Sequence, residues 1–448
     1  MDGAVVPSMV RCDWENSSEI SDLQGLEPTS VSGRTKMMIE IDRERLISEI
    51  EALASISDAE APAVTRIVFT PTDLRARAWL KSRCERCGLS VRTDPIGNTF
   101  VRWEGLDPAL PAVGTGSHID AIPNAGRYDG VVGVLGGLEA IRALQRSGFR
   151  PRHSIELLVF TSEEPTRFGI GCLGSRMLSG ALSPEAARKL TDHADVSLEE
   201  VLTGTGFNGA LEDVQLPNGY YKAFIELHIE QGPQLENQHF PLGVVNNIAA
   251  PASLRIAVEG SGGHAGGVLM PDRRDALCAA AELILAIENA ARTTGSVDSV
   301  ATVGICEVFP GAVNSIPSRV HLTADIRDTD LERRNQVMQL AETAAAAIAT
   351  KRQVLVRSEL VNADMPAVCA PAVVEALSAS CRKHDLPFLP IVSRAYHDSL
   401  FISRIAPTAM LFIPCRKGYS HRPDEYASPE DIATGTLVLA EALAALAQ

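Results

Sequence analysis

The apolar run that begins at Ile155 ends at a pair of adjacent acids, Glu163 and Glu164. An apolar run of this length indicates a buried strand, and the catalytic residues of open α/β sheets gather at the carboxyl ends of strands. Two adjacent carboxylates repel each other unless a cation or a proton lies between them. This short segment therefore predicts an α/β sheet with a charged site at the end of one of its strands.

Strands and helices alternate along the first half of the chain. One predicted strand, 112–116, ends just before His118. Asp129 then opens a helix rich in small residues, 130–146, and the strand that ends at the paired acids follows it. This strand–helix–strand order predicts a parallel sheet covered by helices.

A block of different character interrupts this alternation. From about Pro251 to Val361 the pattern is that of an α+β unit large enough to fold by itself, and the α/β alternation resumes after Asn362. We therefore expect an α/β fold with a mixed, largely parallel sheet that an inserted α+β domain interrupts. The expected parts are a disordered extension (1–35), the first part of the catalytic domain (36–250), the inserted domain (251–362) and the second part of the catalytic domain (363–448).

Composition excludes several classes of protein. The 448 residues suit two or three domains, and the formal charge of −15 argues against a nucleic-acid partner. Nine scattered cysteines do not form a secreted disulfide framework. No apolar run is long enough to cross a bilayer and the N-terminus does not resemble a signal peptide. We therefore expect a cytoplasmic protein with no membrane partner.

Imidazoles and carboxylates recur at the predicted strand ends and at one helix start. This ligand type suits Zn, Mn, Co or Ni and argues against a calcium cage. Five ligands are economical for two metals that share one bridging carboxylate, since each ion keeps an open position. Asp120 lies two residues from His118, so its carboxylate is expected to accept the second ring N–H of that histidine. The candidate ligands are His118, Asp129, Glu164, His228 and His421.

Two other kinds of site find little support. No Gly-x-Ser-x-Gly motif occurs, which argues against a serine nucleophile at a strand–helix turn. The glycine-rich segment 260–267 lacks the Gly-Lys-Ser/Thr ending of a phosphate loop. A turn that presents His264 is the better interpretation of that segment.

Six short motifs together resemble the dimetal amidohydrolases of the aminoacylase/carboxypeptidase superfamily, in the branch that holds allantoate amidohydrolases and N-carbamoyl-amino-acid hydrolases. The resemblance covers nearly everything after residue 39, and histidine rather than an acid at position 228 favours the amidases over the peptidases. The motifs are SHID at 117–120, YDG at 128–130, SEE at 162–164, ELHIEQGP at 226–233, GHAG at 263–266 and HD at 397–398.

The resemblance implies roles for these residues. Asp129, Glu164 and His421 would hold one metal, and His118, Asp129 and His228 a second. Glu163 would be the general base. The inserted domain would be a dimerisation or lid domain that brings His264 to the site of the partner subunit, where it stabilises the oxyanion. Further substrate contacts would come from Asn314 and Arg327, which hold a carboxylate, and from Gln231, Tyr396 and His397.

A finer resemblance concerns the substrate. The segments AAPASL at 249–254, GHAGGVLMP at 263–271, SRAYHDSLF at 393–401 and GYSH at 418–421 resemble the members of this branch that act on ureidoglycolate. Relatives that act on other ureides usually have a small residue where Tyr396 stands. The resemblance implies a homodimer with two divalent cations per subunit, Mn²⁺ in first place with Zn²⁺, Co²⁺ or Ni²⁺ as alternatives.

The implied reaction is hydrolysis of the ureido C–N bond of (S)-ureidoglycolate to glyoxylate, ammonia and carbon dioxide, in ureide and purine nitrogen catabolism. Within the same class, allantoate and N-carbamoyl-L-amino acids are the alternative substrates. A non-catalytic, metal-dependent ureide-binding protein is the alternative from another class. Glu163 counts against it, because a pure binding protein has no use for a base.

Overall fold

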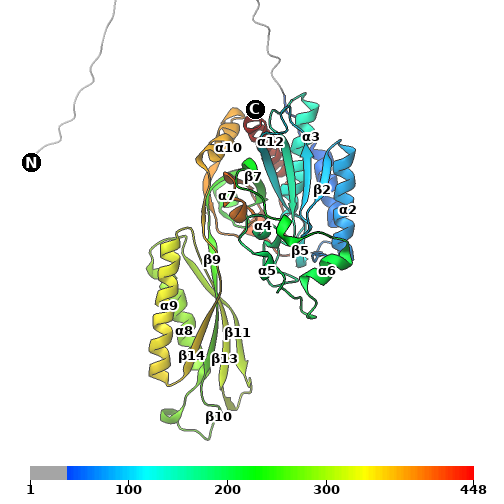
Figure 1. Ribbon diagram of the computed structural model, residues 1–448. Helices are drawn as coiled ribbons and strands as arrows, with labels where there is room; N and C mark the ends of the chain where they lie inside the picture. Colours follow the sequence, from blue (N-terminus) through cyan, green and yellow to red (C-terminus); the bar gives the residue numbers. More distant parts are fainter. Residues whose placement is uncertain (1–37) are drawn as a thin grey trace, which may run out of the picture. The chain divides into compact units, whose positions relative to one another are not determined.

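Nine strands form one mixed sheet in the computed structural model, which describes residues 38–448 (Figure 1). The strand order is β15-β8-β17-β7-β4-β6-β3-β2, with β16 paired to β8. The four central strands run parallel, so their carboxyl ends share one edge of the sheet, and antiparallel pairs flank them on both sides. The expected mixed α/β sheet is therefore confirmed, and the expected extension at 1–35 lies outside the described residues. The strands are β2 (Ser90–Thr93), β3 (Thr99–Trp103), β4 (Ala112–His118), β6 (Ile155–Phe160), β7 (Tyr221–Ile229), β8 (Gly243–Ile248), β15 (Ala367–Val368), β16 (Leu389–Ser393) and β17 (Thr408–Ile413).

Helices α3 (Val131–Arg146) and α12 (Pro429–Leu446) pack on each other and cover one face of the central strands. Close packing here depends on small residues in α3. A Cβ added at Gly133 would lie 2.4 Å from the carbonyl oxygen of Leu227 in β7. Because α3 lies this close to the sheet, its first residues reach the strand ends. Helices α1 (Arg43–Ala54) and α10 (Pro371–Lys383) flank the pair, and α2 (Pro71–Arg86) contacts β2.

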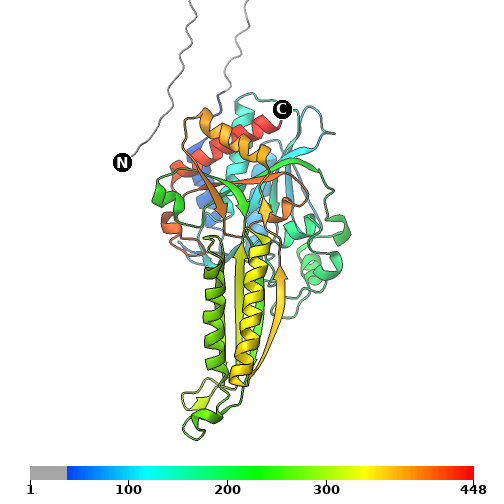
Figure 2. The ribbon, with the colours of Figure 1, turned by 90° about the vertical axis from the view of Figure 1, so that its left-hand side faces the viewer.

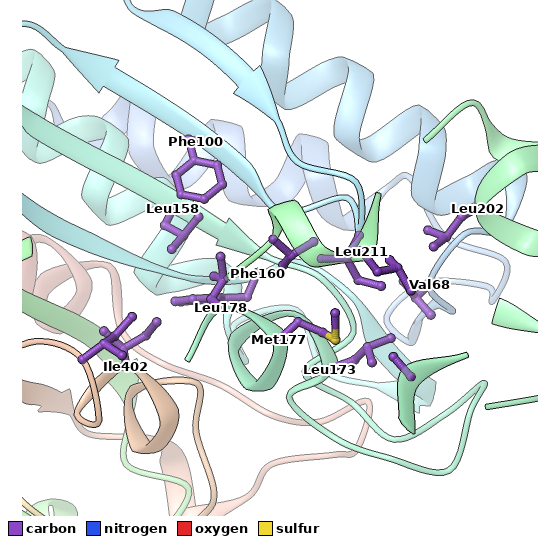
Figure 3. Close-up of a cluster of buried hydrophobic side chains, with 14 of the residues drawn as sticks. Val68, Phe100, Leu158, Phe160, Leu173, Met177, Leu178, Leu202, Leu211 and Ile402 are labelled. Atoms are coloured by element: carbon purple, nitrogen blue, oxygen red, sulfur yellow. The ribbon is translucent and has the colours of Figure 1, made fainter. Parts of the chain in front are cut away.

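The opposite face of the sheet is covered by a large hydrophobic cluster (Figure 3). Leu158 and Phe160 alternate along β6 and point into this cluster, as the two-residue period of a strand requires. Shorter elements complete the layer, among them α4 (Leu173–Leu178), α6 (Leu198–Thr205) and α11 (Ser399–Ile402). The remaining short elements of this part of the chain are β1 (Val64–Arg66), β5 (Ala121–Ala125), α5 (Pro184–Ala187), α7 (Gln234–Gln238) and the 3-10 helices η1 (Leu211–Asp213) and η3 (Arg416–Gly418).

A second sheet has four antiparallel strands in the order β11-β13-β9-β14. Alternate residues of β13 are buried, and they pack with α8 and α9, which lie along one face of this sheet (Figures 1 and 2). The strands pair between Ala250 and Ala363, close to the predicted domain limits, while residues 38–448 form one compact unit. The elements are β9 (Ala250–Glu259), β10 (Gly263–His264), α8 (Ala276–Thr293), β11 (Val300–Phe309), β12 (Ser315–Ile316), β13 (Arg319–Asp328), α9 (Leu331–Arg352) and β14 (Leu355–Ala363).

None of the helices among residues 38–448 combines the length and the apolar character that spanning a membrane requires.

Candidate active site

The carboxyl ends of the parallel strands bring the predicted ligands together. His118 is the last residue of β4 and pairs in register with Phe160, the last residue of β6, so the acids after β6 lie beside it. His228 lies near the end of β7, and Asp129 lies just before α3. The ends of these elements meet at one edge of the sheet, which is where the sequence pattern places the site.

The donor atoms are spaced as ligands of two ions. Asp129 Oδ1 lies 3.4 Å from His118 Nε2 and 3.2 Å from His228 Nε2. Asp129 Oδ2 lies 3.4 Å from His421 Nε2, which in turn lies 3.4 Å from Glu164 Oε1. Two ligands bound at about 2.1 Å to one tetrahedral ion are about 3.4 Å apart. The residues therefore fit two divalent cations, with Asp129 giving one oxygen to each.

Several backbone positions at the site have unusual conformations. Ser162, Gln231 and His421 have φ values of 55°, 54° and 60°, in the left-handed region that costs energy for residues other than glycine. Gly130 has a φ of 65°, and a Cβ there would lie 2.5 Å from His118 Nε2. The chain thus accepts local strain at the residues that surround the ligand cluster, which is common at functional sites.

Burial and neighbouring charges shift the pKa values of the ionisable side chains at this site. It raises the pKa of Glu163 well above its ordinary value, against the effect of His118 and together with Glu164. Burial and the charge of Asp129 raise the pKa of Glu164 to about 7. The hydrogen bond with Asp129 raises the pKa of His421 to about 9, although burial opposes it. Without a cation, bound protons therefore reduce the repulsion among the carboxylates at the predicted metal sites.

Asp120 is placed differently from the sequence expectation. The Nδ1 atom of His118 lies 3.0 Å from the backbone oxygen of Asp120 and 3.7 Å from its carboxylate. The carboxylate instead accepts the backbone N–H groups of Glu163 (3.3 Å) and Glu164 (3.1 Å). These amides follow the end of β6 and have no strand partner, so a buried acceptor satisfies them. Asp120 thus orients the acidic pair, while its carbonyl oxygen orients His118.

A cavity of about 460 Å³ opens beside the ligand cluster. The predicted metal ligands Asp129, Glu164 and His421 line it together with Glu163, and so does Arg327 of the four-stranded unit. The predicted substrate residues Gln231, Tyr396 and His397 also line this cavity.

The polar side chains that line the cavity differ in whether they already have hydrogen-bond partners within the protein. Gln231 Nε2 donates to Asp129 Oδ2 at 2.6 Å, and Arg327 Nε donates to Asp325 Oδ1 at 2.7 Å. His397 is buried, and its Nε2 has no hydrogen-bond partner among residues 38–448. Burial and the neighbouring His228 hold the pKa of His397 well below its ordinary value. His397 is therefore a neutral imidazole among the residues that line the cavity.

His264 and Asn314 lie together but are not among the residues that line the cavity. β10, which ends at His264, pairs with β12, and Ala265 N donates to Asn314 O at 2.8 Å. Arg327 pairs with Pro251 at one end of β9, while β10 follows the other end at Glu259. The ten residues of β9 span about 30 Å. His264 thus lies at the opposite end of this sheet from Arg327.

Glu425 is a site residue that the sequence pattern did not reveal. Its Oε1 accepts the backbone N–H groups of Tyr128 (2.8 Å) and Asp129 (3.2 Å), and its Oε2 lies 3.0 Å from Ser420 Oγ. It thereby fixes the loop that carries the shared carboxylate. Its only sequence signal is its position four residues after His421, among other acids and bases of an irregular segment.

The chain matches the family described as Peptidase family M20/M25/M40 over residues 114–445. It is 52% identical over 415 residues to a ureidoglycolate hydrolase of Arabidopsis thaliana, with 91% of this chain and 87% of the relative covered. It is 37% identical over 412 residues to an N-carbamoyl-L-amino-acid amidohydrolase of Pseudomonas sp. (strain NS671), with 90% of this chain and 98% of the relative covered. A crystal structure of AtUAH in complex with glyoxylate is 51% identical, with a TM-score of 0.83 and coverage of 91% of this chain and 98% of that one.

Proposed function

Because this chain belongs to peptidase family M20/M25/M40, a family of dimetal-dependent hydrolases, we propose that it hydrolyses the ureido C–N bond of (S)-ureidoglycolate. One water is consumed, and the products are glyoxylate, carbon dioxide and two molecules of ammonia. One observation carries the choice of substrate: identity is 52% to the ureidoglycolate hydrolase and 37% to the carbamoyl-amino-acid enzyme. The glyoxylate complex of the AtUAH structure agrees with this choice.

The ligand cluster supports two metal sites per subunit. Asp129, Glu164 and His421 would hold one cation, and His118, Asp129 and His228 the other. The family resemblance puts Mn²⁺ first, and mixed imidazole and carboxylate ligands suit Zn²⁺, Co²⁺ or Ni²⁺ as well. The two cations supply Lewis acidity towards the ureido carbonyl and the attacking water, and a positive charge that keeps Glu163 ionised.

Glu163 would act as the base. It lines the cavity, yet it belongs to neither ligand triad. Its Oε2 lies 3.7 Å from His118 Nε2, and its Oε1 accepts a weak hydrogen bond from Cys172 Sγ at 3.5 Å. From there it takes the proton of the attacking water and later gives it to the leaving nitrogen.

The substrate carboxylate would be bound by Arg327 from one chain and by Asn314 from a second. Arg327 lines the cavity, and its planar fork suits a carboxylate. His264 and Asn314 belong to the short β10–β12 ribbon beyond the other end of β9, about 30 Å from Arg327, so we infer that one chain alone does not complete the pocket. A homodimer in which each inserted domain serves the other subunit's pocket solves this problem. The outer strand β11 exposes Val300 and Ile305 on an edge that a second copy can cover.

Ammonium release tests the proposal. The manganese-loaded protein is given ureidoglycolate, allantoate and N-carbamoyl-L-amino acids side by side, and we expect the highest kcat/KM for ureidoglycolate. Glu163→Gln is the control for catalysis by a contaminating enzyme. A higher kcat/KM for allantoate or a carbamoyl amino acid would reject the substrate but keep the reaction class. Binding of ureidoglycolate without any ammonium release would favour a ureide-binding protein.

A further inference from the structure

Asp364 lies where the chain leaves the four-stranded unit. It follows β14 directly, and its backbone N–H donates to Pro251 O at 3.1 Å. Pro251 lies where the chain enters that unit, so this bond joins the entering segment (250–254) to the leaving segment (361–366). These two segments together are called the crossover. Arg334 of α9 donates to the backbone oxygen of Asp364. Both backbone groups of Asp364 are therefore bound to the inserted unit or to its entry point.

The side chain of Asp364 is bound instead to the part of the chain that carries the predicted metal ligands. Arg176 of α4 donates to both carboxylate oxygens, at 2.9 Å and 2.6 Å. The Tyr396 hydroxyl donates to Oδ2 at 3.0 Å and accepts a hydrogen bond from the same guanidinium. Arg176 is anchored in turn, because its Nε donates to Gly171 O at 2.9 Å and its guanidinium lies 4.4 Å from the Phe401 ring centroid.

This network is both buried and charged. The side chains of Arg176 and Asp364 are 8% and 11% exposed. A bidentate arginine–carboxylate pair is directional as well as strong, and the removal of one partner leaves the other charge buried and unpaired. The contact therefore favours one relative position of the segments that it joins.

This relative position of the segments also affects where Arg327, a residue of the pocket, lies. Arg327 is the register partner of Pro251 in the antiparallel pair of β13 and β9, and Pro251 is bonded to Asp364. We propose that Arg176, Asp364 and Tyr396 form a hinge latch that positions Arg327 in the cavity that the predicted metal ligands also line. This inference rests on the proposed function in so far as the pocket that the latch shapes is the catalytic one.

The latch changes the expected role of Tyr396. The single proton of its hydroxyl is donated to Asp364, so none is left for a substrate hydroxyl. Burial also raises the pKa of the Tyr396 phenol above its ordinary value, which keeps that proton in place. Tyr396 is thus a positioning residue that acts through the crossover, and its ring occupies space in the cavity.

The test is a double-mutant cycle in the full-length, manganese-loaded protein. Tyr396→Phe removes one hydroxyl, and Asp364→Asn removes the charge of the latch. For each single variant we expect faster amide hydrogen exchange in peptides that cover 250–254 and 361–366, with unchanged exchange in β4. We also expect about a tenfold loss in kcat/KM, as for partners in one network, and a double variant little worse than either single variant.

A matched control is Tyr220→Phe. The Tyr220 hydroxyl also contacts an arginine and a carboxylate, Arg92 and Glu156, but Tyr220 lies just before β7, away from the crossover. This variant is expected to leave crossover exchange and kcat/KM unchanged.

Three results would overturn the latch: unchanged crossover exchange in Tyr396→Phe, additive losses in the double variant, or faster exchange throughout the protein. If Asp364→Asn does not fold, the exchange of Tyr396→Phe decides alone. A wild-type protein that releases no ammonium from ureidoglycolate would reject the proposed function, while crossover exchange would still report on the latch.

Discussion

At the scale of single residues, the roles of Glu163 and Glu164 are separated by geometry. Glu164 Oε1 lies 3.4 Å from His421 Nε2, a distance that suits two ligands of one ion. Glu163 faces the cavity without joining either triad. The two acids have the same chemistry and neighbouring positions, but only Glu164 lies within ligand distance of His421 and Asp129, which agrees with the different roles proposed for them.

We therefore expect Glu163→Gln to keep both metals and to lose a factor of about 10²–10⁴ in kcat, the usual contribution of a general base. Metal content is measured by elemental analysis and kcat by ammonium release. Asp129→Ala is the comparison, because loss of the shared carboxylate should lower occupancy at both sites. An ion missing from Glu163→Gln would instead make Glu163 a ligand.

The pKa values of the metal-free ligands predict how metal affinity depends on pH. Glu164, with a pKa of about 7, and His421, with a pKa of about 9, must lose their protons before they bind a cation. Protons compete with the metal, so affinity rises with pH: by up to about tenfold per unit between pH 7 and 9, and more steeply below pH 7. Titration calorimetry of the chelator-stripped protein with Mn²⁺ at pH 6, 7, 8 and 9 measures this. A dissociation constant that is the same at all four values would contradict it.

At the scale of elements, the site depends on how strands end and how α3 begins. The apolar runs and the residues after them predicted the strands that present His118 and Glu163. β8, which lies inside the sheet, was not predicted, because its sequence GVVNNI combines a short apolar start with two asparagines. The contact of Arg176 with Asp364 also left no local signal, since the two residues are 188 positions apart.

The two ends of α3 offer a matched pair of substitutions. Gly130 and Gly148 both have positive φ, at 65° and 77°, so alanine costs about 1 kcal/mol or more at either position. Only at Gly130 would the new Cβ meet His118, whereas nothing lies within 4 Å at Gly148. We expect both variants to lower the free energy of unfolding in urea, and Gly130→Ala alone to weaken metal binding. Equal metal affinity in the two variants would show that His118 moves aside at little cost.

At the scale of the whole molecule, the sequence pattern predicted a mixed α/β sheet interrupted by another unit, and the structure has a nine-stranded mixed sheet and a separate four-stranded one. The central strands β4 and β6 are buried on both faces and therefore appear in the sequence as apolar runs, whereas alternate residues of β13 are buried. The assembly of subunits is harder to predict from the sequence of one chain than its fold. The strongest indication is that His264 and Asn314 lie at the opposite end of β9 from Arg327.

This separation leads to a prediction about mixed subunits. His264→Ala and Glu163→Gln should each be inactive alone, because each lacks one part of every site. If the inserted domain of each subunit completes the site of the other, a hybrid dimer of the two variants has one complete site. That site is built from the intact Glu163 of one chain and the intact His264 of the other. Random exchange of equal amounts gives about half hybrids and so about a quarter of the wild-type activity. Ammonium release is followed while the mixture exchanges, with each variant incubated alone as the control. If His264 served its own chain, no hybrid would hold a complete site and the mixture would stay inactive. A fully active wild-type monomer in the ultracentrifuge would likewise contradict the shared site.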